Sequence, residues 1–430
     1  MKILLKKIFY VVFLSLIVSN TYSVLHIEIT QGVKGAIPII IPSFSYSGAS
    51  DSPLNVAKII KLDLLRSGKF TPSKKSYKDA TSSGSIDFDF LQQKEKDYLV
   101  KGNIKNISPG NYKLSFVLYD VFKKKKMMSY SVKSNQKKLR MTVHNLSDII
   151  FKKITGIDGS FSAKIAYVSA QKTKSGKKIY SLQVAESDGH NPKSILTSKF
   201  PLMSPSWSHD GRSLVYVSFL GRKANIFKQT LATGARQKLA SYRGINGAPE
   251  LSPDGTKLVL TLSFKGNPDI YLLNLGTKKL KQITKSLSID TEPVWMPDGK
   301  SIMFTSDRSG GPQIYEMFVS GGRAIRKTFE GGYNASPNIS PDGKKMTFVT
   351  RSNRKFRVAV MDLSNDNIRI LTPGPMDESP SFSPNGTMII YAASKGYKGV
   401  LGAVSEDGRM RQRLSLSIGD VREPVWSHIK

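Results

Sequence analysis

A turn sequence recurs five times in the second half of the chain at nearly constant spacing. The dipeptides Asp210-Gly211, Asp254-Gly255, Asp298-Gly299, Asp342-Gly343 and Asn385-Gly386 lie 44, 44, 44 and 43 residues apart. Glycine supplies the positive φ that a tight hairpin needs, and the segment after each turn alternates apolar and polar residues. Four short strands in each unit of about 44 residues is the pattern of a β-propeller blade.

Six such units account for residues 159–430. The segment "KIAYVSA" (164–170) opens the series without a turn dipeptide of its own, and "REPVWSHIK" (422–430) ends the chain in the middle of a unit. A propeller ring must close, and closure removes open sheet edges. We therefore predict an all-β six-bladed β-propeller in which the last strand completes the blade begun at Lys164.

Residues 24–158 lack the repeat and predict a small α+β domain. Strands are expected at 26–30, 36–44, 98–104, 112–121 and 127–133, with a hairpin turn at Lys123–Lys126. Apolar residues at helical spacing predict one helix over 55–68 and a second over 146–154. Asn145 or Ser147 is the expected N-cap of the second helix, and Gly156 its end. The segment 156–159 is the expected hinge to the propeller.

Residues 1–23 have the pattern of a secretory signal peptide. Lys2, Lys6 and Lys7 precede an apolar run from Ile8 to Val18, and small residues stand before a cleavage point after Ser23. The apolar run is too short for a membrane-spanning helix, which needs about 20 residues. We therefore expect an exported protein that does not span the membrane; the alternative is an N-terminal anchor.

The chain carries a net charge of +33 and no cysteine. Lysine and arginine are spread over both halves, whereas a nucleic-acid binder concentrates them on one element with interleaved aromatic residues. We therefore expect no nucleic-acid partner and a generally lysine-rich surface, with attraction to an anionic envelope surface as an alternative. Without cysteine, disulfides, cysteine zinc sites, cysteine nucleophiles and a lipidated N-terminal cysteine are excluded.

Catalytic motifs are absent from the sequence. It contains no G-x-S-x-G nucleophile elbow, no H-E-x-x-H metal motif and no phosphate-binding loop. His209 and His428 occupy the proline position of the repeat and are interpreted as turn residues, while His144 is expected just before the second helix. The sequence predicts neither enzymatic activity nor a cofactor.

Acidic residues gather just before the turn of several units, where a propeller brings equivalent positions to one end of its channel. Only Arg422 opposes them there. Such a cluster of like charges is unfavourable unless a partner or a cation compensates it. We expect a binding mouth for a protein or a divalent cation, with ordinary polar loop tips as the alternative. The seven acids are Glu250, Asp290, Glu292, Asp377, Glu378, Asp420 and Glu423.

The mature chain resembles the TolB family of the Tol–Pal envelope system. The most specific stretches are "KKITGIDGSFSAKIAYVS", "LMSPSWSHDG" and "SPNGTMIIYAAS". The resemblance implies a non-enzymatic periplasmic scaffold that links inner-membrane TolA to the peptidoglycan-associated lipoprotein Pal, for outer-membrane integrity and constriction during cell division. Other envelope proteins are further candidate partners. The competing function is a catalytic, small-molecule-binding or glycan-binding propeller.

The resemblance also implies two partner-binding regions. Matching by position assigns Ile245, Ala248, Thr291 and Glu292 to the Pal footprint, although the family often has histidine where this chain has Ile245. The neighbouring loop residues Asn246, Asp290, Asn334, Asp377, Glu378 and Glu423 are placed with them at the mouth.

The TolA-binding region is the N-terminal tail, formed by Val24, Leu25, His26, Ile27, Glu28 and Ile29. Its apolar and polar residues alternate, so it can add as a strand to a sheet edge. The edge can belong to the partner or to the chain's own α+β domain, where the segment is then simply the first strand.

Overall fold

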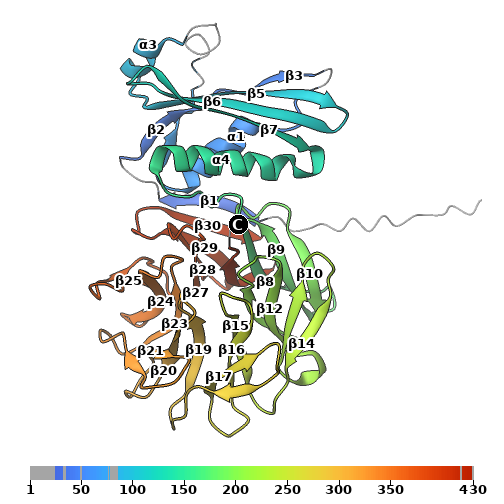
Figure 1. Ribbon diagram of the computed structural model, residues 1–430, viewed down its shortest axis with the longest axis vertical. Helices are drawn as coiled ribbons and strands as arrows, with labels where there is room; N and C mark the ends of the chain where they lie inside the picture. The colour runs from blue at the N-terminus through green and yellow to red at the C-terminus, as the bar shows by residue number, and fades with distance from the viewer. Residues whose placement is uncertain are drawn as a thin grey trace, which may run out of the picture.

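The computed structural model describes residues 25–31, 35–48, 51–75, 77, 86–416 and 419–428. The expected signal peptide and Val24 lie outside these residues. The chain forms a β-propeller with a smaller α+β domain at its side (Figure 1). Among the described residues, no helix is long and apolar enough to cross a membrane.

The propeller has six blades of antiparallel strands, as predicted, and five of them are continuous in sequence. From the inner to the outer strand, these blades are β11 (Leu202–Trp207) to β14 (Arg236–Ala240), β15 (Asn246–Leu251) to β18 (Leu280–Gln282), β19 (Asp290–Trp295) to β22 (Ile325–Arg326), β23 (Asn334–Ile339) to β26 (Ile368–Ile370), and β27 (Asp377–Phe382) to β30 (Arg411–Leu416). Their middle strands are β12 (Ser213–Ser218), β13 (Asn225–Thr230), β16 (Lys257–Leu262), β17 (Asp269–Asn274), β20 (Ser301–Ser306), β21 (Gln313–Phe318), β24 (Lys345–Ser352), β25 (Lys355–Asp362), β28 (Met388–Lys395) and β29 (Lys398–Ser405).

The remaining blade joins the two ends of the propeller and confirms the predicted closure. Its order is β31 (Asp420–Trp426), β8 (Lys164–Lys172), β9 (Lys178–Glu186) and β10 (Lys193–Ser198). Val425 pairs with Ala166, and the Ser427 amide donates to the Lys164 carbonyl at 2.8 Å. The last strand of the chain is therefore the innermost strand of the blade that begins the ring.

The predicted turns form as expected. In the first turn of the β15–β18 blade, the Gly255 amide donates to the Ser252 carbonyl at 2.8 Å, and Gly255 has φ +70°. Asp254 Oδ1 accepts from the Thr256 amide at 2.9 Å. The glycine is required here because other residues adopt this φ only at a cost.

Between blades, buried residues such as Val215 and Leu260 share one apolar cluster.

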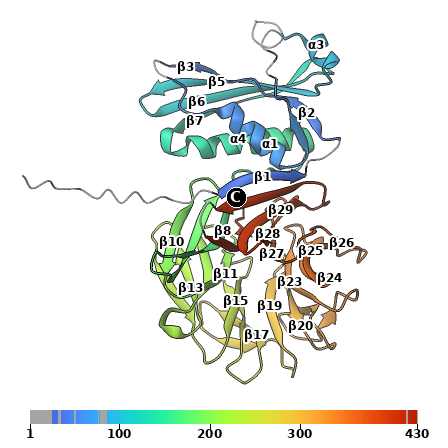
Figure 2. The ribbon, with the colours of Figure 1, turned by 180° about the vertical axis from the view of Figure 1, so that it is seen from behind.

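The α+β domain is a sheet with two helices on one face (Figure 2). The sheet order is β4 (Phe70–Pro72), β2 (Ile37–Ile40), β5 (Tyr98–Ser108), β6 (Asn111–Asp120) and β7 (Lys125–Asn135), and β3 (Ser45–Ser47) pairs with β5. Helices α1 (Val56–Arg66) and α4 (Leu139–Thr155) bury their apolar stripes in its core. The short elements β3, β4 and α3 (Phe88–Gln93) were not predicted.

Helix α4 begins seven residues earlier than predicted, so the expected caps Asn145 and Ser147 are wrong. A 3₁₀ turn at Gln136–Lys138 leads into α4, and Asn135 caps that turn. Leu139 and Val143 extend the buried stripe, and their burial outweighs the weak helix propensity of Thr142 and Asn145. Gly156, with φ +76°, ends the helix as predicted.

The N-terminal strand β1 (Leu25–Gln31) joins the propeller and not the sheet of the α+β domain. It pairs antiparallel with β30, the outer strand of the β27–β30 blade, with Ile27 opposite Leu414. The expectation that this segment could be the first strand of its own domain is therefore wrong. The segment does add to a sheet edge, but that edge lies nearly 400 residues away in sequence, which local patterns cannot reveal.

Candidate partner-binding mouth and central channel

All six inner strands contain a kink at the same repeat position. In each, one non-glycine residue has a φ between 43° and 54° and stands directly before a proline. The strand register shifts at this point in every blade, for example between Thr291 and Val294. The chain therefore forms a β-bulge, which turns the next side chains toward the axis. The six bulge residues are Ser204, Ala248, Glu292, Ser336, Ser379 and Glu423.

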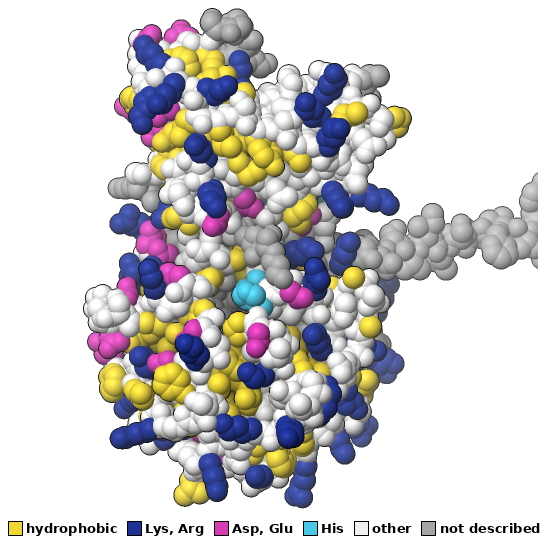
Figure 3. All heavy atoms as spheres, viewed as in Figure 1, with side chains coloured by type: hydrophobic (Ala, Val, Ile, Leu, Met, Phe, Trp, Pro, Cys, Tyr) yellow, Lys and Arg dark blue, Asp and Glu magenta, His cyan; other side chains and the backbone are white. Residues whose placement is uncertain are grey.

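These bulges line a central channel that encloses a cavity of about 430 Å³. Figure 3 shows a hollow in the middle of the propeller, with histidine side chains beside it. We call the end where the inner strands begin the mouth. The turn positions lining the other end are Pro253, Pro297, Pro341, Pro384, His209 and His428. The two histidine rings lie against each other at a tilt of 38°, with centroids 4.7 Å apart.

Three of the seven predicted acids, Glu250, Glu292 and Glu423, line the channel, and each bonds to the neighbouring blade. Glu292 accepts from Thr305 Oγ1 on its own blade at 2.8 Å, and from the amide and hydroxyl of Ser336 on the next blade at 2.9 and 2.7 Å. Glu423 accepts from the Ser204 amide, and Glu250 from the Trp295 amide at 3.3 Å. These carboxyl groups connect successive blades.

Burial raises the pKa of two of these carboxyl groups. The pKa of Glu250 rises to about 8, because the Trp295 amide only partly offsets the loss of solvent. Burial also raises the pKa of Glu423, against the opposing effect of the Ser204 amide. Glu250 is therefore mostly protonated at neutral pH.

The other four acids do not join a common acidic ring, and the predicted cluster of like charges is wrong in this respect. Asp290 is fully buried and bonds through both oxygens to Arg308, each at 2.9 Å. Asp377 is buried and accepts from the Gly374 amide, and Asp420 accepts from the Gly399 amide at 3.0 Å. Only Glu378 is exposed. Asp290, Asp377 and Asp420 are thus each bonded to a nearby group of the protein.

Two further residues assigned to the mouth are buried. Asn246 binds the Tyr242 amide and carbonyl at 2.8 and 2.7 Å, and Asn334 donates to Gln313 and to the Glu330 carbonyl. Their side chains, like those of Asp290 and Asp377, hold the conformation of the mouth loops through these hydrogen bonds. The side chains that remain accessible at the mouth are those of Ile245, Ala248, Thr291, Glu292, Glu378 and Glu423.

Apart from Ile245, the sequence analysis missed an apolar rim around the mouth. Eight large apolar side chains lie exposed on the loops or strand ends of this face, between blades or between the second and third strands of a blade. Exposed apolar groups gathered on one face mark interaction sites more often than scattered ones do. The signal in the sequence was the recurrence of apolar residues near the start of the inner strands and, for Leu220 and Tyr397, in the loop between the second and third strands. The rim consists of Met203, Leu220, Ile245, Leu287, Ile289, Phe329, Met376 and Tyr397.

Comparison with known proteins agrees with this architecture. Residues 25–127 match the family model described as the TolB amino-terminal domain, and residues 151–430 match the TolB beta propeller domain. Among solved structures, TolB from Acinetobacter baumannii superposes with a TM-score of 0.88 at 39% identity. That alignment covers 94% of this chain and 100% of the other.

Curated relatives are similar over nearly the whole chain. The Tol-Pal system protein TolB of Nitrosococcus oceani is 54% identical over 410 residues, covering 95% of this chain and 94% of the relative. The protein of the same name from Xanthomonas oryzae pv. oryzae is 47% identical, covering 94% and 92%. The chain therefore belongs to the TolB family of Tol-Pal system proteins.

Proposed function

We propose that this protein is a non-enzymatic periplasmic scaffold whose propeller mouth binds Pal and whose N-terminal strand binds TolA. Through these two contacts it supports outer-membrane integrity and constriction during cell division. The apolar rim is the observation that carries the Pal contact. The rim contains Phe329, Tyr397 and two methionines, and aromatic residues and methionine are enriched at protein interfaces. Membership of the TolB family supports the choice of partners.

The hydrogen bonds of the channel carboxyl groups also agree with a scaffold that has no catalytic activity. Glu250, Glu292 and Glu423 accept hydrogen bonds from neighbouring blades, which occupies the groups that an active site would need. The proposed function requires no cofactor, and a divalent cation in the channel would have to displace these bonds. A glycan-binding or small-molecule-binding channel remains the competing proposal, and it predicts a ligand in the cavity instead of a protein at the rim.

Replacing Ile245 tests the mouth. Ile245 is 49% exposed on the rim, and Ile325, on the outer strand β22, is 58% exposed. We expect Ile245→Asp to weaken binding of the soluble domain of Pal by at least about 30-fold, the scale of an interface hot spot. Ile325→Asp should change the affinity by less than about threefold. Calorimetric titration measures the affinity of each variant for Pal. Equal affinities for the two variants would show that Pal does not bind at the mouth.

Replacing Glu292 is a second test of the same interface. Because Glu292 accepts three hydrogen bonds, Glu292→Ala should lower the melting temperature as well as the affinity for Pal. Lys124→Ala is the control, since Lys124 lies in the other domain and forms an ion pair there with exposed Asp89. A Glu292→Ala variant that binds Pal like Lys124→Ala would leave this carboxylate outside the interface.

The N-terminal strand is tested by locking it in place. Glu28 lies opposite Arg413 in the β1–β30 pair, and the chain has no cysteine of its own. The double variant Glu28→Cys/Arg413→Cys therefore yields a single disulfide that holds β1 on the propeller. If TolA binds β1 after it leaves β30, oxidation should abolish TolA binding and reduction should restore it.

Deleting residues 24–31 should abolish TolA binding irrespective of the redox state. A deletion variant that keeps its melting temperature and still binds TolA would contradict the assignment of the tail. An oxidised double variant that binds TolA normally would instead mean that TolA uses the other edge of β1, which no strand of the described residues pairs with.

A further inference from the structure

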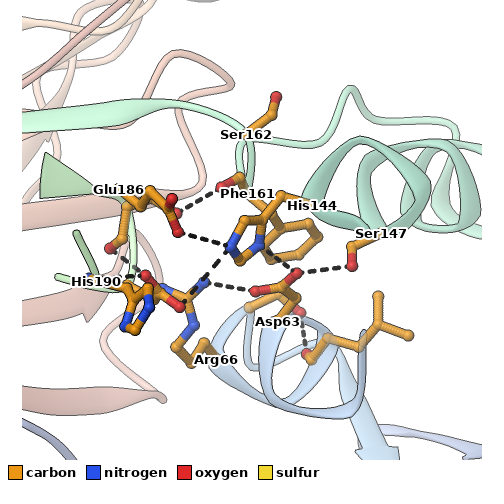
Figure 4. A network of polar contacts seen from close by, with 12 residues as sticks. Asp63, Arg66, His144, Ser147, Phe161, Ser162, Glu186 and His190 are labelled. Carbon is orange, nitrogen blue, oxygen red and sulfur yellow. Dashed lines mark hydrogen bonds and ion pairs between the residues drawn. The ribbon is translucent and has the colours of Figure 1, made fainter. Parts of the chain in front are cut away.

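A buried network of charged side chains joins the two domains (Figure 4). From the α+β domain, helix α1 contributes Asp63 and Arg66, and helix α4 contributes Arg140, His144 and Ser147. From the propeller, the end of β9 and the following turn contribute Glu186, Ser187 and Asp188. The mouth and the tail do not use these residues, and His144 lies inside helix α4, not before it as the sequence suggested.

His144 stands at the centre of this network and has no exposed surface. Its Nδ1 lies 2.7 Å from Asp63 Oδ2, which also accepts from the Ser147 hydroxyl at 2.7 Å. Its Nε2 faces the propeller, 3.4 Å from a Glu186 oxygen and 3.8 Å from an Asp188 oxygen. The imidazole therefore lies between a carboxylate of one domain and two carboxylates of the other.

The two arginines make parallel connections across the interface. Arg140 donates to Glu186 at 2.7 Å and also binds Asp188. Arg66 binds Asp63 at 2.7 Å and donates to the Ser187 carbonyl at 3.2 Å. In addition, Gln412 on β30 donates to the Arg66 carbonyl at 2.6 Å. All of these contacts except the Arg66–Asp63 pair, which lies within α1, would be lost if the domains separated.

The charges of the network balance only when His144 is protonated. Asp63, Glu186 and Asp188 supply three negative charges, and Arg66 and Arg140 supply two positive ones. A neutral imidazole would leave one uncompensated charge in a region where Asp63 and His144 are almost completely buried, which is costly. An imidazolium makes the set neutral and gives Nε2 a proton directed at the carboxylates.

A metal ion fits this position less well than a proton. His144, Glu186 and Asp188 offer ligand atoms within 4.8 Å of one another. However, the guanidinium of Arg140 already binds both carboxylates, and a dication would stand beside that positive charge. With a dication and a neutral imidazole, the network would carry a net positive charge. The composition of the cluster therefore favours the proton.

We propose that protonated His144 is a pH-sensitive latch that holds the α+β domain against the propeller. When His144 loses its proton, the contacts of Glu186 and Asp188 with α4 weaken, and the interface opens locally. The device sets how rigidly the two domains are joined, independently of which partners bind the mouth or the tail.

The electrostatic environment supports this role. Burial alone would lower the pKa of His144, but the hydrogen bond and charge of Asp63, with Glu186 and Asp188, raise it to about 9. The pKa of Glu186 is lowered and that of Asp188 falls to about 2, so both stay charged. The latch is therefore complete below pH 6.5 and is lost as pH rises through about 9.

Other polar groups around His144 are accounted for. Asp148, one turn further along α4, accepts from the amides of Phe161 and Ser162 and does not bond to the imidazole. On the propeller side, Asn191 donates to the second oxygen of Glu186 at 2.7 Å, and the His190 amide donates to Asp188. His190 takes part through its backbone, which makes its side chain a matched control.

The test combines histidine titration with hydrogen exchange in the mature chain. In the nuclear magnetic resonance spectrum of protein labelled at histidine, the signal missing from His144→Gln should titrate near pH 9 in the wild type. Exchange at residues 160–163 and 186–190, corrected for its intrinsic pH dependence, should rise at least about tenfold between pH 6.5 and 9.5 in the wild type. His144→Gln should show the faster exchange at both pH values, and His190→Gln should behave like the wild type.

Three results would overturn the latch. A His144 signal that titrates at or below pH 6.5 would show that the imidazole is neutral in the network. Unchanged exchange in the wild type between the two pH values would show that the proton does not hold the interface. Restoration of slow exchange at pH 9.5 by zinc, and its reversal by chelator, would identify a metal site. If His144→Gln fails to fold, histidine signals assigned through Asp63→Asn, which should lower the pKa of His144, decide the question.

Discussion

Deleting the closing strand, residues 420–430, is expected to abolish cooperative folding of the propeller. Strand β31 supplies Val421 and Trp426 to the apolar cluster between the first and last blades, and it is the inner neighbour of β8. Loss of a buried Trp costs about 3–5 kcal/mol and loss of a buried Val about 1–3 kcal/mol. Together with the broken strand pairing, this approaches the whole stability of an ordinary domain, about 5–15 kcal/mol.

Circular dichroism melting and limited proteolysis measure this effect. The truncated chain should lack a sharp transition and should be cleaved within the blades. The control is Ser427→Ala, which removes only the hydrogen bond from the Lys164 amide at 2.8 Å and should cost about 1 kcal/mol. A truncated chain that melts within a few degrees of the full-length protein would mean that the ring does not depend on β31.

The propeller could be predicted because its determinants are local and repeated. Each Asp-Gly or Asn-Gly turn fixes a hairpin within about ten residues, and the constant spacing makes every blade a copy of the last. The position of Trp426 in the sixth copy then specifies closure. The strand that begins at Lys164 opens the series without an inner strand before it, and Trp426 pairs with its second residue, Ile165. Because the units repeat, the long-range pairing of β31 with β8 can be predicted by counting the units.

The α+β domain and the tail were predicted less well because their contacts are long-range and occur once. Pairing of β1 with β30 depends on where the domain packs, and no pattern in residues 25–31 specifies it. The same holds for the network around His144. Asp63, His144 and Glu186 are widely separated in sequence, and each alone is indistinguishable from a surface residue. No motif relates them, so only the folded chain brings them together.

The acidic mouth was misjudged because of the bulges. Asp290 and Glu292 are two residues apart, so simple strand alternation places them on one face. The bulge at Glu292 breaks that alternation: Asp290 turns into the blade toward Arg308, while Glu292 lines the channel. A residue with positive φ before proline is not recognisable from one sequence, so the division of the acids into two groups could not be foreseen.

The outer strands give a structural reason for part of the positive charge. All six carry at least one lysine or arginine and no acid: β10, β14, β18, β22, β26 and β30 read KSILTS, RQKLA, LKQ, IR, IRI and RQRLSL. Charged residues on an edge strand oppose pairing with another chain. The ring of outer edges is thus protected by repulsion between like charges, and among the described strands only β30 is covered, by β1.

Replacing Glu250 by glutamine is expected to remove a pH dependence of stability and to stabilise the protein at pH 8. Glu250 has a pKa of about 8 in the folded chain and an ordinary value of 4.5. A carboxyl group with a raised pKa loses stability as pH rises from the unfolded value to the folded one. At 1.36 kcal/mol for each pH unit the penalty reaches about 4–5 kcal/mol. Solvent in the channel screens part of it, so we expect about 2–4 kcal/mol.

Glutamine can replace Glu250 without losing the contact to the next blade. Glu250 accepts from the Trp295 amide, and at the equivalent position of another blade Asn338 accepts from the Phe382 amide at 2.8 Å through its amide oxygen. Denaturant unfolding should therefore show stabilities within about 1 kcal/mol of each other for wild type and Glu250→Gln at pH 5, and a clearly more stable variant at pH 8.

The reciprocal change makes the matched control. Asn338→Asp places a carboxyl group at the equivalent channel position and should create the same loss of stability between pH 5 and pH 8 that Glu250→Gln removes. Both effects arise because an inner-strand side chain must accept an amide hydrogen bond away from bulk water, a task that a neutral amide performs at every pH. If the two variants and the wild type lose stability equally from pH 5 to pH 8, the channel does not raise the pKa of Glu250.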